Sequence, residues 1–171
     1  FNEDLFEFMR ERRAIPMTTV TTTLEYMVAR NCQIKAGIVE QDPQEKGVRA
    51  VLNYGHTVGH ALERAAGEWE LRHGEVVAAG IVAEARIAEW MGLGDAETTR
   101  RQTDLLTAYG LPTRVEGVDM QRAVEALRRD KKIVAGKLRM PLVPSIGSFE
   151  ILDDVPLEIV ERALRSVADE A

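Results

Sequence analysis

The segment EVVAAGIVAEARIAEWM, residues 75–91, decides the fold class of this 171-residue chain. Apolar residues occupy most helical faces at the start of the segment, and Gly92 or Gly94 can end it. A helix that is apolar on most of its faces is typical of one enclosed by other helices. We therefore expect a helix over residues 75–91 at the centre of a helical bundle.

Further helices are predicted on both sides of this segment. Apolar spacing, capping residues and Gly or Pro breaks place them at 3–12 (capped by Asn2), 19–39, 48–66, 96–109, 120–129 and 156–168, with a loop over 41–47. Alternating residues predict two short strands, 137–143 and 148–152, joined as a hairpin through 144–147. The expected fold is mainly α, a multihelical bundle with a small β-hairpin near the C-terminus, forming one domain over residues 1–171.

The composition is typical of a soluble globular domain, with 45% hydrophobic and 29% charged residues. The formal net charge of -6 disfavours nucleic acid or an anionic membrane surface as a partner. No apolar run approaches the roughly 18 residues of a membrane span, and no leader pattern is present, so the cytoplasm is the expected location. The single cysteine, Cys32, excludes an intrachain disulfide and is interpreted as a buried apolar thiol.

The three histidines of the chain are His56, His60 and His73, gathered in one short stretch. His56 and His60 are four residues apart, so on a helix they share one face, as in HxxxH pairs that bind a transition metal. His73 precedes the central helix, and a helical hairpin can return it to the same place. Two of the histidines could bind metal while the third does acid–base or anion work, or all three could be ligands; the spacing leaves this open.

Glycines stand directly before two of the histidines, at Gly55 and Gly59. Each costs on the order of 1 kcal/mol of helix stability relative to alanine. Two glycines four residues apart remove the side chains from one helix face, which predicts close approach of another helix or of a ligand.

Four blocks of the sequence resemble the 3-dehydroquinate synthases, members of the sugar phosphate cyclases. They are LNYGHTVGHALE (52–63), LRHGEVVAAGIVAEARIAEWMGL (71–93), IKAGIVEQDPQEKGVRA (34–50) and RRDKKIVAGKLRMPLVPSIG (128–147). The resemblance implies a two-domain enzyme in which an N-terminal α/β domain binds NAD and a helical domain carries most metal and substrate groups. This chain would be the second domain only, and its start at Phe1 within a helical pattern fits a piece of a longer protein.

The resemblance also implies roles for individual residues. The metal, usually zinc with cobalt as an alternative, would be held by His56, His73 and a glutamate from a segment preceding Phe1, while His60 would lie on the phosphate side of the substrate. Lys35 and Arg49 would meet the substrate carboxylate and ring, and Glu45 would be an active-site acid. Further substrate contacts would come from Asn53, expected one helical turn before His56, and from Lys131 or Lys132, with Lys131 favoured.

The substrate implied by the resemblance is a seven-carbon sugar acid phosphate, an anion that would need the local positive charge of these lysines and arginines. The metal would act as a Lewis acid on vicinal hydroxyls and NAD would perform the redox chemistry. A homodimer of the full-length enzyme is expected, and the domain alone is expected to be inactive.

Three other readings remain at this point. Another sugar phosphate cyclase, of the 2-deoxy-scyllo-inosose or valiolone type, shares the histidine pattern. Asn53 and the DKK run at residues 130–132 favour dehydroquinate synthase over it. An iron-type polyol dehydrogenase shares the two-domain plan but needs no phosphate-side lysine. A non-enzymatic helical metal-binding or interaction module would bind metal without a pocket for an anionic sugar.

Overall fold

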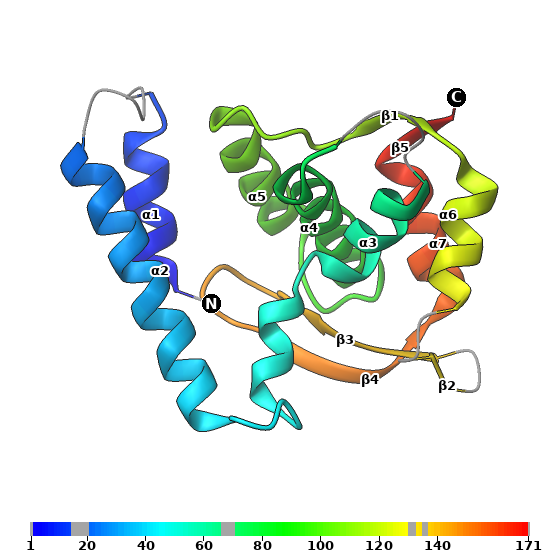
Figure 1. Cartoon of the computed structure of the whole chain (residues 1–171), viewed down its shortest axis with the longest axis horizontal. Coiled ribbons are helices and arrows are strands. Elements are labelled where there is room, and N and C mark those ends of the chain that lie inside the picture. Colours follow the sequence, from blue (N-terminus) through cyan, green and yellow to red (C-terminus); the bar gives the residue numbers. More distant parts are fainter. Residues whose placement is uncertain (1, 15–20, 66–70, 130–132, 135–136, 171) are drawn as a thin grey trace.

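The computed structural model describes residues 2–14, 21–65, 71–129, 133–134 and 137–170 (Figure 1). Its helices are α1 (Glu3–Arg12), α2 (Thr21–Gln41), the 3₁₀ helix η1 (Val48–Asn53), α3 (His56–Ala65), α4 (His73–Trp90), α5 (Ala96–Ala108), α6 (Met120–Arg128) and α7 (Leu157–Ser166). Its strands are β1 (Val115–Val118), β2 (Ile133–Val134), β3 (Lys137–Leu142), β4 (Glu150–Pro156) and β5 (Ala168–Glu170). The predicted mainly α fold with a small hairpin near the C-terminus is confirmed.

Helix α4 is the centre of the domain, as its apolar sequence predicts. It packs against α3, α5 and α7 (Figure 1). Its Val76, Val82 and Ile87 side chains are fully buried. Burying each such side chain contributes about 1.5–3 kcal/mol to folding. The helix ends at Trp90, and the φ of +72° at Gly92, just beyond it, allows Leu93 to donate its N–H to the Ala88 carbonyl at 2.9 Å.

Two small sheets flank the helices. Strands β3 and β4 form the predicted antiparallel hairpin, with Met140 opposite Leu152, and β2 adds to the other edge of β3. The second sheet was not predicted: β1 and β5 pair in parallel, and Val115 donates its N–H to the Val167 carbonyl at 2.8 Å. Because these strands have four and three residues, neither shows a strand pattern in the sequence.

The prediction of one continuous helix over residues 48–66 is wrong. Helix η1 ends at Asn53, and the chain turns at Tyr54 and Gly55 before α3 begins at His56. Gly55 has a φ of +83°, a conformation that no α-helix contains and that glycine adopts without strain. Asn53 therefore does not share a helix with His56, contrary to the expectation of one turn between them.

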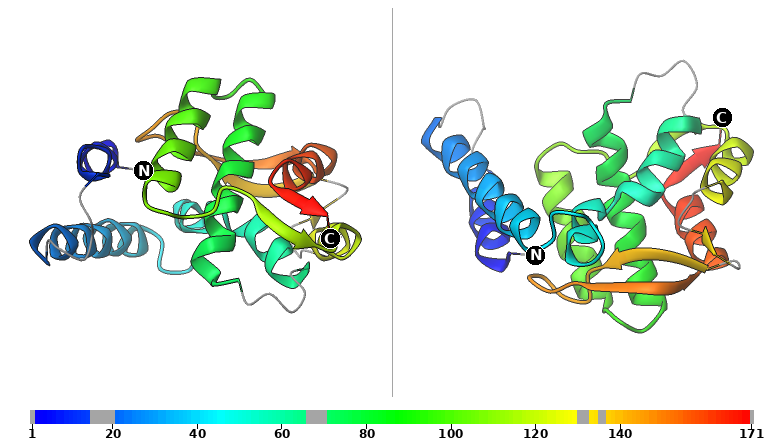
Figure 2. Two further views of the ribbon diagram at one scale, coloured as in Figure 1. Left: turned by 90° about the horizontal axis from the view of Figure 1, so that it is seen from above. Right: turned by 60° about the horizontal axis from the view of Figure 1, so that its bottom comes forward.

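Helices α1 and α2 form an arm at one edge of the molecule, visible in Figure 1 and in both views of Figure 2. Few of its side chains are buried, and Leu24 and Val28 of α2 are 44% and 55% exposed. Cys32 on α2 is also exposed, so its predicted burial is wrong.

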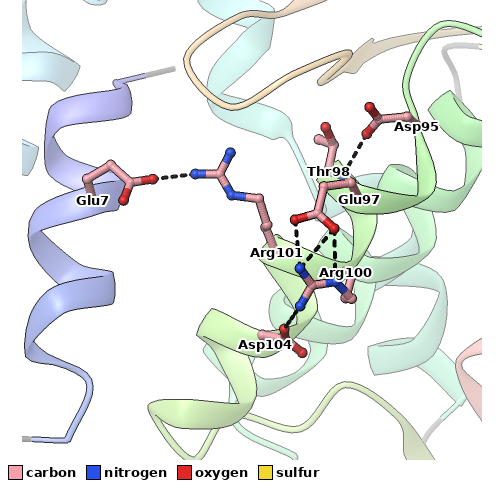
Figure 3. Close-up of polar contacts among 7 residues, drawn as sticks. All are labelled: Glu7, Asp95, Glu97, Thr98, Arg100, Arg101 and Asp104. Atoms are coloured by element: carbon pink, nitrogen blue, oxygen red, sulfur yellow. Dashed lines mark hydrogen bonds and ion pairs between the residues drawn. The ribbon is translucent and has the colours of Figure 1, made fainter.

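An ion pair between Glu7 of α1 and Arg101 of α5 joins the arm to the main body (Figure 3). The hydrogen bond from Arg10, together with the positive charge of Arg101, lowers the pKa of the Glu7 carboxyl. Tyr109 adds a second contact, donating its hydroxyl hydrogen to the Met9 carbonyl at 2.9 Å. These two polar contacts connect α1 to α5 and its C-cap.

None of the described helices combines the length and the apolar character that crossing a membrane would require.

Candidate metal and substrate site

The three imidazoles lie together at the place where α3 and α4 begin. His56 is the first residue of α3 and His73 is the first residue of α4, while His60 follows one turn after His56. The ring centroids of His56 are 5.5 Å from His60 and 5.4 Å from His73, and those of His60 and His73 are 5.8 Å apart. The predicted convergence of two segments on one point is therefore present in the fold.

Direct backbone contact between α3 and α4 brings the histidines together. A Cβ atom added at Gly80 would lie 1.9 Å from the Gly55 carbonyl oxygen, and one added at Gly59 would lie 3.0 Å from the Val76 carbonyl oxygen. The glycines leave room for the two helices to approach to this distance. The close helix approach predicted from Gly55 and Gly59 is confirmed.

One carboxylate accompanies the imidazoles. Glu63 of α3 places Oε1 3.4 Å from Nδ1 of His73, and potential ligand atoms of His60, Glu63 and His73 all lie within 4.8 Å of one another. Ligands about 2.1 Å from a tetrahedral zinc ion are roughly 3.4 Å apart, so a cation would draw these groups together by about 1 Å. Imidazole nitrogen and carboxylate oxygen suit zinc and cobalt, and the residues present fit such an ion.

Glu63 is expected to support cation binding through His73. A carboxylate next to one ring nitrogen favours the tautomer that presents the other nitrogen to the metal, and losing such a partner typically costs 10–100-fold in affinity. We expect Glu63→Gln to weaken Co²⁺ binding by the chain by about tenfold. Titration followed by visible absorption measures the effect, and Glu116→Gln, at an exposed position of β1, is the control. Equal affinity of Glu63→Gln and Glu116→Gln would contradict this role.

A second group of predicted site residues lies directly before the histidine helix. Glu45 accepts a hydrogen bond from Nδ2 of Asn53 at 3.0 Å, and its other oxygen is 3.8 Å from Nε of Arg49. Glu45 also has a φ of +55°, a left-handed conformation that is uncommon for a residue other than glycine and frequent at functional sites. The structure therefore brings Glu45, Arg49 and Asn53 into one cluster.

Asp42 holds the loop that carries Glu45. Its carboxylate accepts backbone N–H groups from Lys46 at 3.0 Å, Gly47 at 2.7 Å and Arg49 at 3.1 Å. The hydrogen bonds from Lys46 and Gly47 are the main cause of the lowered pKa of the Asp42 carboxyl. Asp42 was not predicted as a site residue, although an aspartate before a proline in a loop is a common signal for such a turn.

Among the described residues, no predicted lysine belongs to either group of site residues. Lys35 is exposed on α2, and it has no ionic partner among the described residues. Lys131 and Lys132 lie outside the described residues. Glu63 was missed by the sequence reasoning, although it is three residues after His60 and seven after His56, a spacing that places it on the same helix face.

The fold and the site define the class of the protein: a mainly helical domain with a candidate transition-metal centre, preceded in the chain by the cluster of Glu45, Arg49 and Asn53. The family model described as 3-dehydroquinate synthase C-terminal matches residues 1–133. The chain belongs to this family.

Full-length relatives agree with this assignment. A 3-dehydroquinate synthase from Synechococcus is 41% identical over 99% of this chain and 47% of its own length. One from Nostoc punctiforme is 43% identical over 84% of this chain and 40% of its own length, and one from Shewanella sp. is 38% identical over 96% and 46%. The chain spans about half the length of these curated relatives.

Solved structures share the fold. A 2-epi-5-epi-valiolone synthase from Streptomyces hygroscopicus, solved with NAD⁺ and Zn²⁺ bound, superposes with a TM-score of 0.79 at 24% identity, covering 96% of this chain and 46% of that one. A 2-deoxy-scyllo-inosose synthase in complex with carbaglucose-6-phosphate, NAD⁺ and Co²⁺ has a TM-score of 0.74 at 24% identity, covering 84% and 42%. At this identity the likeness shows the fold.

Proposed function

We propose that this chain is the metal- and substrate-binding domain of a 3-dehydroquinate synthase. The full-length protein converts 3-deoxy-D-arabino-heptulosonate 7-phosphate to 3-dehydroquinate and phosphate, a step of the shikimate pathway that leads to aromatic amino acids. The observation that carries the proposal is the convergence of His56, His60 and His73 in a chain of this family.

His56 and His73 are proposed to hold the divalent metal, zinc or cobalt, together with a carboxylate from the other half of the protein. The bound ion supplies Lewis-acid polarisation of the substrate hydroxyls, and NAD bound by that other half supplies the redox chemistry. Support comes from the imidazole donor set and from the relatives' structures, which carry NAD⁺ with Zn²⁺ or Co²⁺.

The remaining residues of the chain are proposed to bind and orient the anionic substrate. Arg49 and Lys35 supply positive charge for the carboxylate, while His60 and either Lys131 or Lys132 supply it for the phosphate. Glu45 orients Arg49 and Asn53, because its two carboxylate oxygens face them. The full-length protein is proposed to be a cytoplasmic homodimer, as the family resemblance implies.

The activity test compares the full-length protein with the 171-residue chain. With NAD and Zn²⁺ or Co²⁺, the full-length protein is expected to release phosphate from 3-deoxy-D-arabino-heptulosonate 7-phosphate and not from glucose 6-phosphate. The chain alone is expected to release none under the same conditions, because it lacks the NAD-binding half and the carboxylate ligand that this half is proposed to supply. Phosphate release from the hexose phosphate alone would favour the 2-deoxy-scyllo-inosose type, and turnover by the isolated chain would contradict the division of roles.

A further inference from the structure

Glu84 is a buried acidic residue in the middle of the apolar helix α4. Its side chain is 0% exposed, although Ala83 and Ala85 beside it and Ile87 one turn later are apolar core residues. Burying a carboxylate costs several kcal/mol unless hydrogen bonds compensate for the lost hydration. Such a residue in a core helix therefore needs a structural or functional reason.

The partners of Glu84 lie at the start of the helix that carries His56. Oε2 accepts the N–H of Gly55 at 2.7 Å, and Oε1 accepts the N–H of Thr57 at 3.2 Å. Gly59 donates its N–H to the Gly55 carbonyl, so Gly55 is the N-cap residue directly before α3. Glu84 thus caps α3 from a different helix, and its negative charge lies at the positive end of the α3 dipole.

The two donor residues, Gly55 and Thr57, stand directly before and after His56, so the backbone of His56 is held between them. The imidazole is also held, since Nδ1 of His56 is 3.2 Å from the Tyr54 carbonyl oxygen. A carbonyl oxygen only accepts, so a hydrogen bond here puts the proton on Nδ1 and leaves the lone pair of Nε2 free for a cation. The turn at Tyr54 and Gly55, which Glu84 holds in place, therefore orients both the backbone and the imidazole ring of His56.

Glu84 acts together with Gly80, which lies one turn earlier on the same face of α4. Gly80 lets the backbone of α4 meet the Gly55 carbonyl, and Glu84 then receives the N–H of the same glycine. One helix face thereby sets both the distance and the register between α3 and α4.

We propose that Glu84 is the positioning residue of the histidine cluster: it accepts the backbone N–H groups of the residues before and after His56 and so holds this imidazole opposite His60 and His73. The part of this inference that concerns a cation rests on the proposed function; the anchoring of the α3 start does not.

The test compares Glu84→Gln and Glu84→Ala in the 171-residue chain, with Glu89→Gln on the same helix as the matched control. Glu84→Gln keeps the shape but turns an NH₂ donor towards one of the two N–H groups. We expect Glu84→Gln to lower the Co²⁺ affinity about tenfold and Glu84→Ala to lower it further, while Glu89→Gln keeps the affinity of the parent chain. The visible Co²⁺ spectrum should also change, which a loss of stability alone would not cause in a folded sample.

A metal-free measurement decides the anchoring itself. Amide hydrogen exchange at Gly55 and Thr57 is expected to be at least about tenfold faster in Glu84→Gln, with the later residues of α3 unchanged. Unchanged exchange at both amides would overturn the proposal, as would unchanged Co²⁺ affinity in Glu84→Gln when His56→Ala weakens it. If the parent chain binds no Co²⁺, its histidines need the carboxylate of the other half of the protein to hold the ion, and the exchange rates still decide the role of Glu84.

Discussion

The His73→Ala variant of the chain is expected to lose Co²⁺ and Zn²⁺ affinity by more than about 100-fold, beyond the range of residues that act through another ligand. His73 belongs to every donor set that the site allows. It is one of the two ligands implied by the family resemblance, and it is also a member of the group with His60 and Glu63. Titration with Co²⁺, with Zn²⁺ measured by competition against a chelating dye, gives the loss. Parent-like affinity in His73→Ala would contradict a metal centre at this place.

The other two histidines distinguish the alternative ligand sets. If His56 and His73 bind the ion, His56→Ala should be as damaging as His73→Ala, and His60→Ala should leave the affinity nearly unchanged. If the ion instead lies among His60, Glu63 and His73, the effects of His56→Ala and His60→Ala are reversed. Circular dichroism at the titration temperature serves as the control, because it shows whether each variant keeps the parent's helical content.

The Gly80→Ala variant is expected to lose about 3 kcal/mol of folding free energy or more. The added Cβ would lie 1.9 Å from the Gly55 carbonyl oxygen, which is a backbone atom and cannot rotate away as a side chain can. Helices α3 and α4 would have to separate along the face where they pack most closely. The midpoint of urea unfolding measures the loss.

Gly74→Ala on the same helix is the matched control for Gly80→Ala. No atom outside its immediate surroundings lies within 4 Å of the added Cβ, so the substitution is expected to stabilise the chain by about 0.5–1 kcal/mol, as alanine does in helices. Equal unfolding midpoints for the two variants would show that the α3–α4 contact tolerates separation.

The sequence predicted the helices well because their apolar residues recur at helical spacing, and it predicted α4 at the centre because that helix is apolar on most faces. It failed at Tyr54 and Gly55, since Val48, Val51 and Leu52 continue a helix-like pattern into α3 and the left-handed conformation of Gly55 leaves no mark in that pattern. The β1–β5 pair was missed because each strand is short and its partner lies about 50 residues away, so only the folded chain brings them together.

In the candidate site, too, some residues could be predicted from the sequence and others could not. The histidines could be identified because three residues of one rare type gather in a short stretch. Glu45, Arg49 and Asn53 could be identified only through the family resemblance. Glu84 could not be identified, because one acid in an apolar helix reveals neither its burial nor its partners. These partners are backbone N–H groups, and no residue type in the sequence reports them.

The arm of α1 and α2 has a consequence for how the chain moves. Its few buried side chains make it the segment expected to open first, while α3 and α4, whose apolar side chains are buried in the core, stay packed. Lys35 lies on helix α2 of the arm, whereas the three histidines lie on α3 and α4. If Lys35 binds the substrate anion and the histidines hold the cation, as we propose, the two tasks belong to two units of unequal rigidity, so that one can be loosened while the other remains intact.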